Sequence, residues 1–189
     1  MRRFLALSVL LPLAFAAACN DATSLSPPTQ TNVVDTVTIG ALEGTPITTP
    51  SGFSLSLSSV AAVRTDQSVD FEFAYNIRQL PDDTYQRVFI PRAALGISTT
   101  SANPGLQQRT ETFDGITRAQ SNGYVTDSVV PVALGDRFVV RSRVICTDLG
   151  VPLYGKLEIL SFQDSTVTIQ VLADRNCGYK DLLPGLPAN

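Results

Sequence analysis

Apolar and polar residues alternate along most of this 189-residue chain. The clearest case is the segment DFEFAYNI, where Phe71, Phe73 and Tyr75 share one face while Asp70 and Glu72 share the other. A period of two residues is typical of a β-strand that buries one face and exposes the other. The pattern therefore predicts that the three aromatic residues belong to the core and that the two acidic residues line a solvated face.

The same period predicts further strands in the segments 35–41, 52–58, 87–91, 123–130, 136–146, 153–162 and 165–174. Turn-forming residues such as LPDD at 80–83 separate them, and QDS at 163–165 predicts a short hairpin connection. A helical turn or two is expected at 110–119, in TETFDGITRA. Many short strands without a long helical period predict an all-β fold, an antiparallel β-sandwich or barrel-like single domain with at most one short helix.

Residues 1–18 have the pattern of a secretory signal peptide. Arg2 and Arg3 precede an uncharged, mainly apolar run from Phe4 to Ala18, and the run ends in small residues. This run is shorter than the roughly 20 apolar residues that a transmembrane helix needs. We therefore expect it to direct export.

The tetrapeptide AAAC at 16–19 resembles a bacterial lipobox, in which the cysteine is linked to diacylglycerol and becomes the first residue. The alternative is ordinary cleavage before Cys19, which leaves a free thiol. The number of cysteines favours the lipobox, because three cysteines in an exported chain leave one over when two form a disulfide. We expect lipidation of Cys19 and a disulfide between Cys146 and Cys177.

Strand phase also pairs the two downstream cysteines. Cys146 shares parity with Phe138 and Val140, and Cys177 shares parity with Val171. If both strands keep their register, both thiols face the same apolar interior. An exported compartment permits the bond, which would stabilise the fold by about 3 kcal/mol.

Residues 19–32 are expected to form a lipid-anchored flexible linker, and the β-sandwich domain is expected at 33–189. The stretch NDATSLSPPTQTN after Cys19 has few apolar side chains and a Pro-Pro pair, so it cannot bury enough apolar surface to fold. At ~3 Å per residue, it could hold a domain roughly 40 Å from a bilayer.

The charge balance and the residue types narrow the possible functions. Removing Arg2 and Arg3 leaves 12 basic and 17 acidic side chains, a net charge of −5, which argues against a nucleic-acid partner. The chain has no histidine, which excludes a Ser-His-Asp site. It also lacks the clustered cysteines of a zinc site and the glycine patterns of nucleotide-binding loops. We therefore expect a protein that is not an enzyme and that has no metal site.

Two carboxylate pairs are the remaining candidates for chemistry. Asp82 and Asp83 stand in a predicted turn, where a backbone-bonding role is favoured over a calcium site. Asp70 and Glu72 would lie roughly 7 Å apart along one strand face, a separation that an inverting glycosidase could use. A solvated strand face explains the same alternation and is favoured.

Arginines and tyrosines supply the candidate ligand-binding residues Arg141, Arg143, Tyr124 and Tyr154. Both arginines share strand parity with Arg137, which predicts a row of positive charge on one face. Such a row can bind a carboxylate or phosphate ligand, or it can pair with acidic residues on the neighbouring strand. The two tyrosines lie near predicted strand ends, where they could line an apolar pocket with a polar rim or simply pack.

Four segments have a distinctive strand-like pattern: DFEFAY near Asp70, RFVVRS at 137–142, LYGKLEIL at 153–160 and TVTIQV at 166–171. Together they resemble the HmuY-type lipoproteins, which are haem-binding surface lipoproteins of Gram-negative bacteria. The resemblance implies an all-β fold, a lipid anchor and an outer-membrane or cell-surface location. Members of this family hold haem iron through pairs of histidines or methionines, and the chain from Cys19 onward has neither. The family's ligands therefore do not carry over, and a haem site would need non-histidine ligation, for which tyrosine is suited.

Together these features predict a lipid-anchored envelope or surface lipoprotein that acts as a binding or interaction module. Its expected partners are the membrane, through Cys19, and a small ligand or an envelope protein. A haem or porphyrin carrier of HmuY type is one alternative, and a purely structural envelope protein is another. An apolar pocket rimmed by Arg141 or Tyr154 would favour the carrier, whereas a filled core with flat faces would favour the structural protein.

Overall fold

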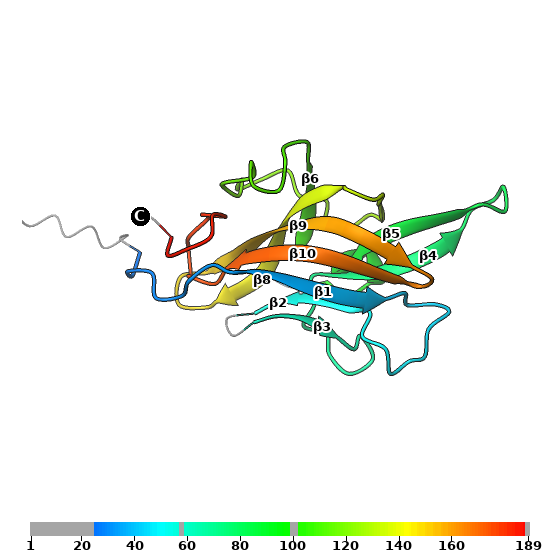
Figure 1. The fold of residues 1–189 in the computed structure, drawn as a ribbon. Coiled ribbons are helices and arrows are strands. Elements are labelled where there is room, and N and C mark those ends of the chain that lie inside the picture. The colour runs from blue at the N-terminus through cyan, green and yellow to red at the C-terminus, as the bar shows by residue number, and fades with distance from the viewer. Residues whose placement is uncertain (1–24, 57–58, 99–101, 188–189) are drawn as a thin grey trace, which may run out of the picture.

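The computed structural model describes residues 25–56, 59–98 and 102–187, and these residues form two antiparallel sheets that pack face to face (Figure 1). The first sheet has the order β1 (Val34–Gly40), β10 (Thr166–Asp174), β9 (Val151–Gln163), β8 (Arg137–Cys146) and β6 (Gly105–Arg109). The second sheet has the order β3 (Val60–Val63), β2 (Gly52–Leu55), β4 (Phe73–Gln79), β5 (Tyr85–Pro91) and β7 (Val130–Pro131). The predicted all-β fold is confirmed, and it is a β-sandwich.

The alternating pattern places the apolar faces of both sheets in a shared core. Phe73 and Tyr75 on β4 are fully buried, and their rings lie 4.4 and 6.3 Å from that of Phe89 on β5. Phe138 on β8 reaches the same ring at 6.0 Å, which joins the two sheets. Phe71 is buried as well, so the predicted core role of the three aromatic residues is confirmed. Each such side chain contributes about 1.5–3 kcal/mol by leaving water.

A second, smaller cluster covers the outer face of the first sheet. The chain between β6 and β7 lays Phe113 and Ile116 against Val139 of β8. Residues 110–119 form turns there, so the predicted helix is wrong. The buried Lys156 ammonium group holds these turns on the sheet, because it donates to the carbonyls of Phe113 and Ile116 at 2.8 and 3.0 Å.

The helical content of the described residues is a single 3-10 helix, η1 (Arg92–Leu95), which ends at Gly96 in a left-handed conformation with φ 80°. Within that same part of the chain, no helix has the length and apolarity that a membrane span requires. The predicted signal peptide and Cys19 lie outside the described residues.

The strand at 123–130 is shorter than predicted. It is reduced to β7 and to a single bridge between Val125 and Leu106 of β6. The chain crosses closely over β6 at this point, because a Cβ on Gly105 would lie 2.7 Å from the Val125 carbonyl oxygen. Two strands, β3 and β6, were not expected, since VAAV and GLQQR do not alternate.

Candidate functional site

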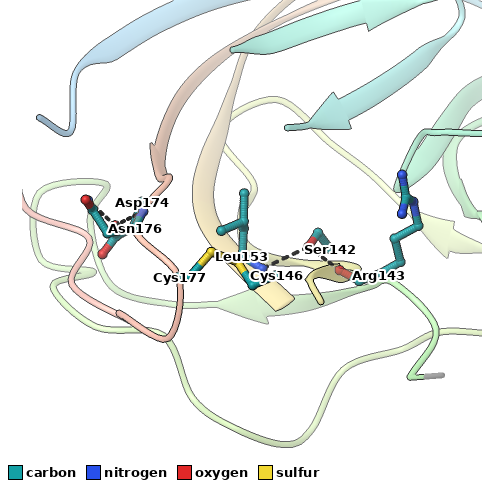
Figure 2. The surroundings of a disulfide bond; sticks show 7 residues. All are labelled: Ser142, Arg143, Cys146, Leu153, Asp174, Asn176 and Cys177. Atoms are coloured by element: carbon teal, nitrogen blue, oxygen red, sulfur yellow. Dashed lines mark hydrogen bonds between the residues drawn. A yellow bond between two sulfur atoms is a disulfide. The ribbon is translucent and has the colours of Figure 1, made fainter. Parts of the chain in front are cut away.

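Cys146 and Cys177 form the predicted disulfide, with 5.7 Å between their Cα atoms (Figure 2). The predicted strand phase of the two cysteines is wrong, however. Cys177 lies beyond β10, which ends at Asp174, and Cys146 follows two register shifts in β8. The bond therefore ties the end of β8 to the C-terminal segment, across the intervening strand β9.

A β-bulge precedes this disulfide. The register of β8 shifts after Arg141, where β8 contains one residue more than the facing part of β9. Ser142 Oγ fills the gap in the ladder, because it accepts a hydrogen bond from the Leu153 amide at 2.9 Å and donates to the Arg143 carbonyl at 2.5 Å (Figure 2). One extra residue turns the side chains that follow to the opposite face of a sheet.

The bulge separates the arginines that were predicted to form one row. Arg137 pairs with Glu158 on β9 at 2.9 Å, which confirms the pairing with an acidic neighbour for this residue. Arg143 instead pairs with Asp70 at 2.8 Å, in the segment that leads into the second sheet. The predicted continuous row is therefore wrong at Arg143, which belongs to different surroundings from Arg141.

Three of the four predicted ligand-binding residues meet on the outer face of the first sheet. The Arg141 guanidinium lies 4.7 Å from the centre of the Tyr124 ring, and the Tyr124 and Tyr154 rings are 6.3 Å apart. The Tyr124 hydroxyl donates to the Gln120 carbonyl at 2.8 Å, and Lys180 lies over Tyr154 at 5.7 Å. Burial raises the pKa of both phenols, so both are neutral. The Arg141–Tyr124 contact fastens the chain between β6 and β7 to the sheet, and the Lys180–Tyr154 contact fastens the C-terminal segment to it.

Glu72 is buried, which contradicts its predicted place on a solvated face. Only 3% of the residue is exposed, and Oε2 accepts a hydrogen bond from the Leu55 amide at 2.5 Å. The β2–β4 ladder ends at Phe53, so the Glu72 carboxyl group takes the place of a backbone carbonyl as the acceptor for the Leu55 amide. Burial raises the pKa of Glu72 to about 8, although the Leu55 bond and the charges of Arg143 and Arg92 oppose the rise.

The two carboxylate pairs therefore serve the fold. Asp70 is exposed whereas Glu72 is buried, so they do not face a common substrate space. The predicted turn role of Asp82 and Asp83 is confirmed. Asp82 Oδ1 accepts from the amide and hydroxyl of Thr84 at 3.2 and 2.6 Å, and Asp83 takes φ 62°. Among the described residues, no group of three or more Cys, Asp or Glu side chains is placed to hold a metal ion.

A half-open cavity of about 400 Å³ lies at the end of the sandwich that carries the disulfide, which we call the disulfide end. It is lined by Ser26, Pro27, Thr29, Gln30, Leu149, Arg175, Asn176, Cys177 and Tyr179. Asn176 holds one wall, because its Oδ1 accepts from the Thr29 and Gln30 amides at 2.8 and 2.9 Å and its Nδ2 donates to the Gln30 carbonyl at 2.8 Å. The Tyr179 hydroxyl donates to the Ser26 carbonyl at 3.0 Å.

These bonds make the second half of the predicted linker a part of the folded domain. Asn32 is 1% exposed, its backbone pairs with Gly185, and its side-chain amide donates to the carbonyls of Asp181 and Leu183. The sequence of this stretch contains no apolar period, so it carried no pattern from which docking could be predicted. Polar side chains, chiefly Asn32 and Asn176, perform the docking.

Asp174 lies beside this wall. It is fully buried, and its Oδ1 accepts from the backbone amide and the side-chain amide of Asn176 at 3.0 and 2.9 Å (Figure 2). Burial raises the pKa of its carboxyl group. Asn176 therefore connects a buried carboxyl group to the docked N-terminal segment.

Comparison of the chain with protein-family models, with curated proteins and with solved structures gave no match. The resemblance to the HmuY-type lipoproteins therefore stays a prediction.

Proposed function

We propose that the protein is a non-enzymatic lipoprotein of the bacterial envelope, anchored at the outer membrane or cell surface through Cys19, which presents its β-sandwich as a binding or interaction module. The observation that carries this proposal is the Cys146–Cys177 disulfide. Because the chain has three cysteines, this bond leaves Cys19 as the odd cysteine. Cys19 directly follows an uncharged run with a basic start, which is the position of the lipid in a bacterial lipoprotein.

Three of the buried ionisable side chains have structural roles, which supports a protein that is not an enzyme. Lys156 is bonded to two backbone carbonyls, Glu72 to a backbone amide, and Asp174 to Asn176. Each of these groups stabilises a junction between segments of the fold. A catalytic acid or base would instead need to reach the reacting proton of a substrate.

The anchor is tested by expressing the full precursor with Cys19→Ser and comparing it with the wild type. We expect the wild type in the membrane fraction, with an N-terminal peptide whose mass includes the acyl chains, and the variant in the soluble fraction. Ser24→Ala is the matched control, since it leaves both Cys19 and the apolar run intact and should remain in the membrane fraction. An unmodified Cys19 in membrane-bound protein would refute the anchor.

The alternative of an HmuY-like haem or porphyrin carrier is tested on the soluble Cys19→Ser chain by a haemin titration. The Tyr124 hydroxyl is bonded to Gln120 and Tyr154 is only 5% exposed, so neither phenol is presented to a ligand. We therefore expect no saturable shift of the Soret band. A shifted band that saturates near one haemin per chain would favour the carrier instead.

A further inference from the structure

We propose that the disulfide end of the sandwich is a membrane-contacting surface, which rests on the lipid bilayer that holds the anchor. This inference rests on the proposed lipidation of Cys19 and adds to it the orientation of the domain. The docked N-terminal segment, the short tether that it leaves and the exposed leucines around the cavity carry it.

The first step is the position at which the described chain begins. Figure 1 shows the N-terminal segment, the turn between β8 and β9 and the C-terminal segment together at one end of the sandwich. Leu25 packs over Gly178 there, directly after the disulfide. The bonds of Ser26, Thr29 and Gln30 to the C-terminal segment hold the chain at this end. The path toward Cys19 therefore starts beside the cavity.

The second step is the reach of the tether. Six peptide steps separate Cys19 from Leu25, and they span at most about 20 Å when fully extended. A linker that ran freely to residue 32 would have reached about twice as far. The 13 residues of β9 alone extend over about 43 Å along the sandwich. The disulfide end is thus held within half a domain length of the bilayer.

The third step is the chemistry of the surface at this end. Leu149 lines the cavity, while Leu183 and Leu186 flank the Gly185 that pairs with Asn32. Large fractions of the apolar side chains here are exposed: Val33 63%, Leu149 50%, Leu183 44% and Leu186 60%. Apolar groups that enter the boundary between headgroups and acyl chains lose their contact with water, which favours binding by ~25 cal/mol per Å².

Exposed apolar side chains also occur elsewhere, so apolarity alone does not choose the end. Ile47 and Tyr85 are 73% and 70% exposed. Tyr85 starts β5 directly after the hairpin that joins it to β4, at the end of the molecule opposite the chain termini (Figure 1). The tether selects the disulfide end, and Tyr85 supplies a matched control site.

The test uses the absence of tryptophan from the chain, which makes a single introduced tryptophan a unique reporter. The variants L149W, L186W and Y85W are purified as acylated full-length mature chains and reconstituted into phosphatidylcholine vesicles with or without brominated acyl chains. We expect bromine to reduce the fluorescence of L149W and L186W by about half and to leave Y85W nearly unchanged, because the contact reaches only the outer ~5–10 Å of the bilayer. Since this contact is apolar, a roughly tenfold increase in salt should not abolish the quenching.

Each outcome has a distinct meaning. Absence of quenching in L149W and L186W, with acylation verified by mass, would overturn the membrane-contacting surface and leave the lipid anchor standing. Equal quenching in Y85W would show that the domain lies on its side, and loss of quenching in high salt would show a contact driven by charge; either result overturns the inference. Absence of acylation would overturn the anchor and the inference together. Far-ultraviolet circular dichroism and a thiol count confirm that each variant keeps its sheets and its disulfide.

Discussion

The two ends of this β-sandwich are held by contacts of very different range. At the hairpin end, which we define by the turns 80–84 and 163–166, neighbours in the chain bond to one another. Asp82 accepts from Thr84, and Asp164 adopts φ 49° between β9 and β10. At the disulfide end, the Cys146–Cys177 bond and the Tyr179–Ser26 hydrogen bond join residues 31 and 153 positions apart. The structure of the hairpin end can therefore be predicted from local sequence, whereas the contacts of the disulfide end form only in the assembled fold.

The two ends also differ in the burial of their carboxyl groups. Asp174 is bonded to Asn176 beside the cavity. The charge of Arg143, which follows the bulge near the disulfide, acts on the pKa of the buried Glu72. Asp82 at the hairpin end is exposed. We expect stability to respond more strongly to changes at the disulfide end.

The largest effect is expected from removing the disulfide with the double variant C146S/C177S. Closing a loop between residues 31 positions apart restricts the unfolded chain, so its loss should lower the free energy of unfolding by about 3–4 kcal/mol. Urea-induced unfolding of both proteins measures the difference. A loss below about 1 kcal/mol would mean that the hydrogen bonds of Asn32 and Asn176 hold this end without the cross-link.

The next effect is a pH dependence from Glu72, which E72Q should remove. Because the folded-state pKa of Glu72 is about 8 and its ordinary value is 4.5, the folded protein binds this proton more tightly than the unfolded chain. The contribution of Glu72 to the free energy of unfolding is then largest below about pH 4.5 and falls as the pH rises toward 8, by at most ~1.4 kcal/mol per pH unit. Glutamine keeps an oxygen for the Leu55 amide and does not titrate, so the profile should flatten.

Urea unfolding at a series of pH values between 5 and 9 measures this effect, with E43Q as the matched control. Glu43 is exposed and is not among the charges that act on Glu72, so E43Q should keep the fall in stability with rising pH. Asp174 also has a raised pKa and contributes a slope of the same sign, which E72Q retains. An unchanged slope in E72Q would contradict the assignment to Glu72.

The smallest effects are expected from replacing one polar side chain at each end of the sandwich with alanine. N176A removes the bonds to Thr29, Gln30 and Asp174, and leaves buried polar groups unpaired, so it should lower the free energy of unfolding by about 1–3 kcal/mol. D82A removes bonds within an exposed turn and should lower it by about 0.5 kcal/mol.

Hydrogen exchange separates a local role from a general loss of stability. N176A should speed the exchange of the Thr29 and Gln30 amides more than that of amides in β9, because Asn176 is their acceptor. Equal acceleration throughout both regions would contradict a specific docking role for this asparagine.

Ligand binding by Arg141, Arg143, Tyr124 and Tyr154 stays a prediction, and the structure shows which of these residues lie together. Tyr124, Tyr154 and Arg141 do come together, because each lies on or beside the outer face of the first sheet. Arg143 does not join them, since parity counting assumes a ladder without extra residues and the bulge at Ser142 breaks that assumption. The prediction that Glu72 is exposed was wrong for a related reason. The alternating pattern assumes that the strand stays paired, but the β2–β4 ladder ends at Phe53. The Glu72 carboxyl group therefore turns inward and accepts from the Leu55 amide.

Patterns in the sequence were enough to predict the all-β class, the aromatic core around Phe73 and Tyr75, the turn at Asp82 and the pairing of Cys146 with Cys177. Period-two burial, turn chemistry and cysteine number are properties of neighbouring residues or of composition, so they can be read without coordinates. Only the folded chain shows the bulge, the burial of Glu72 and the docking of residues 26–32 onto the C-terminal segment. These features satisfy backbone groups with side chains from distant parts of the chain, and no local pattern specifies which partner will be near.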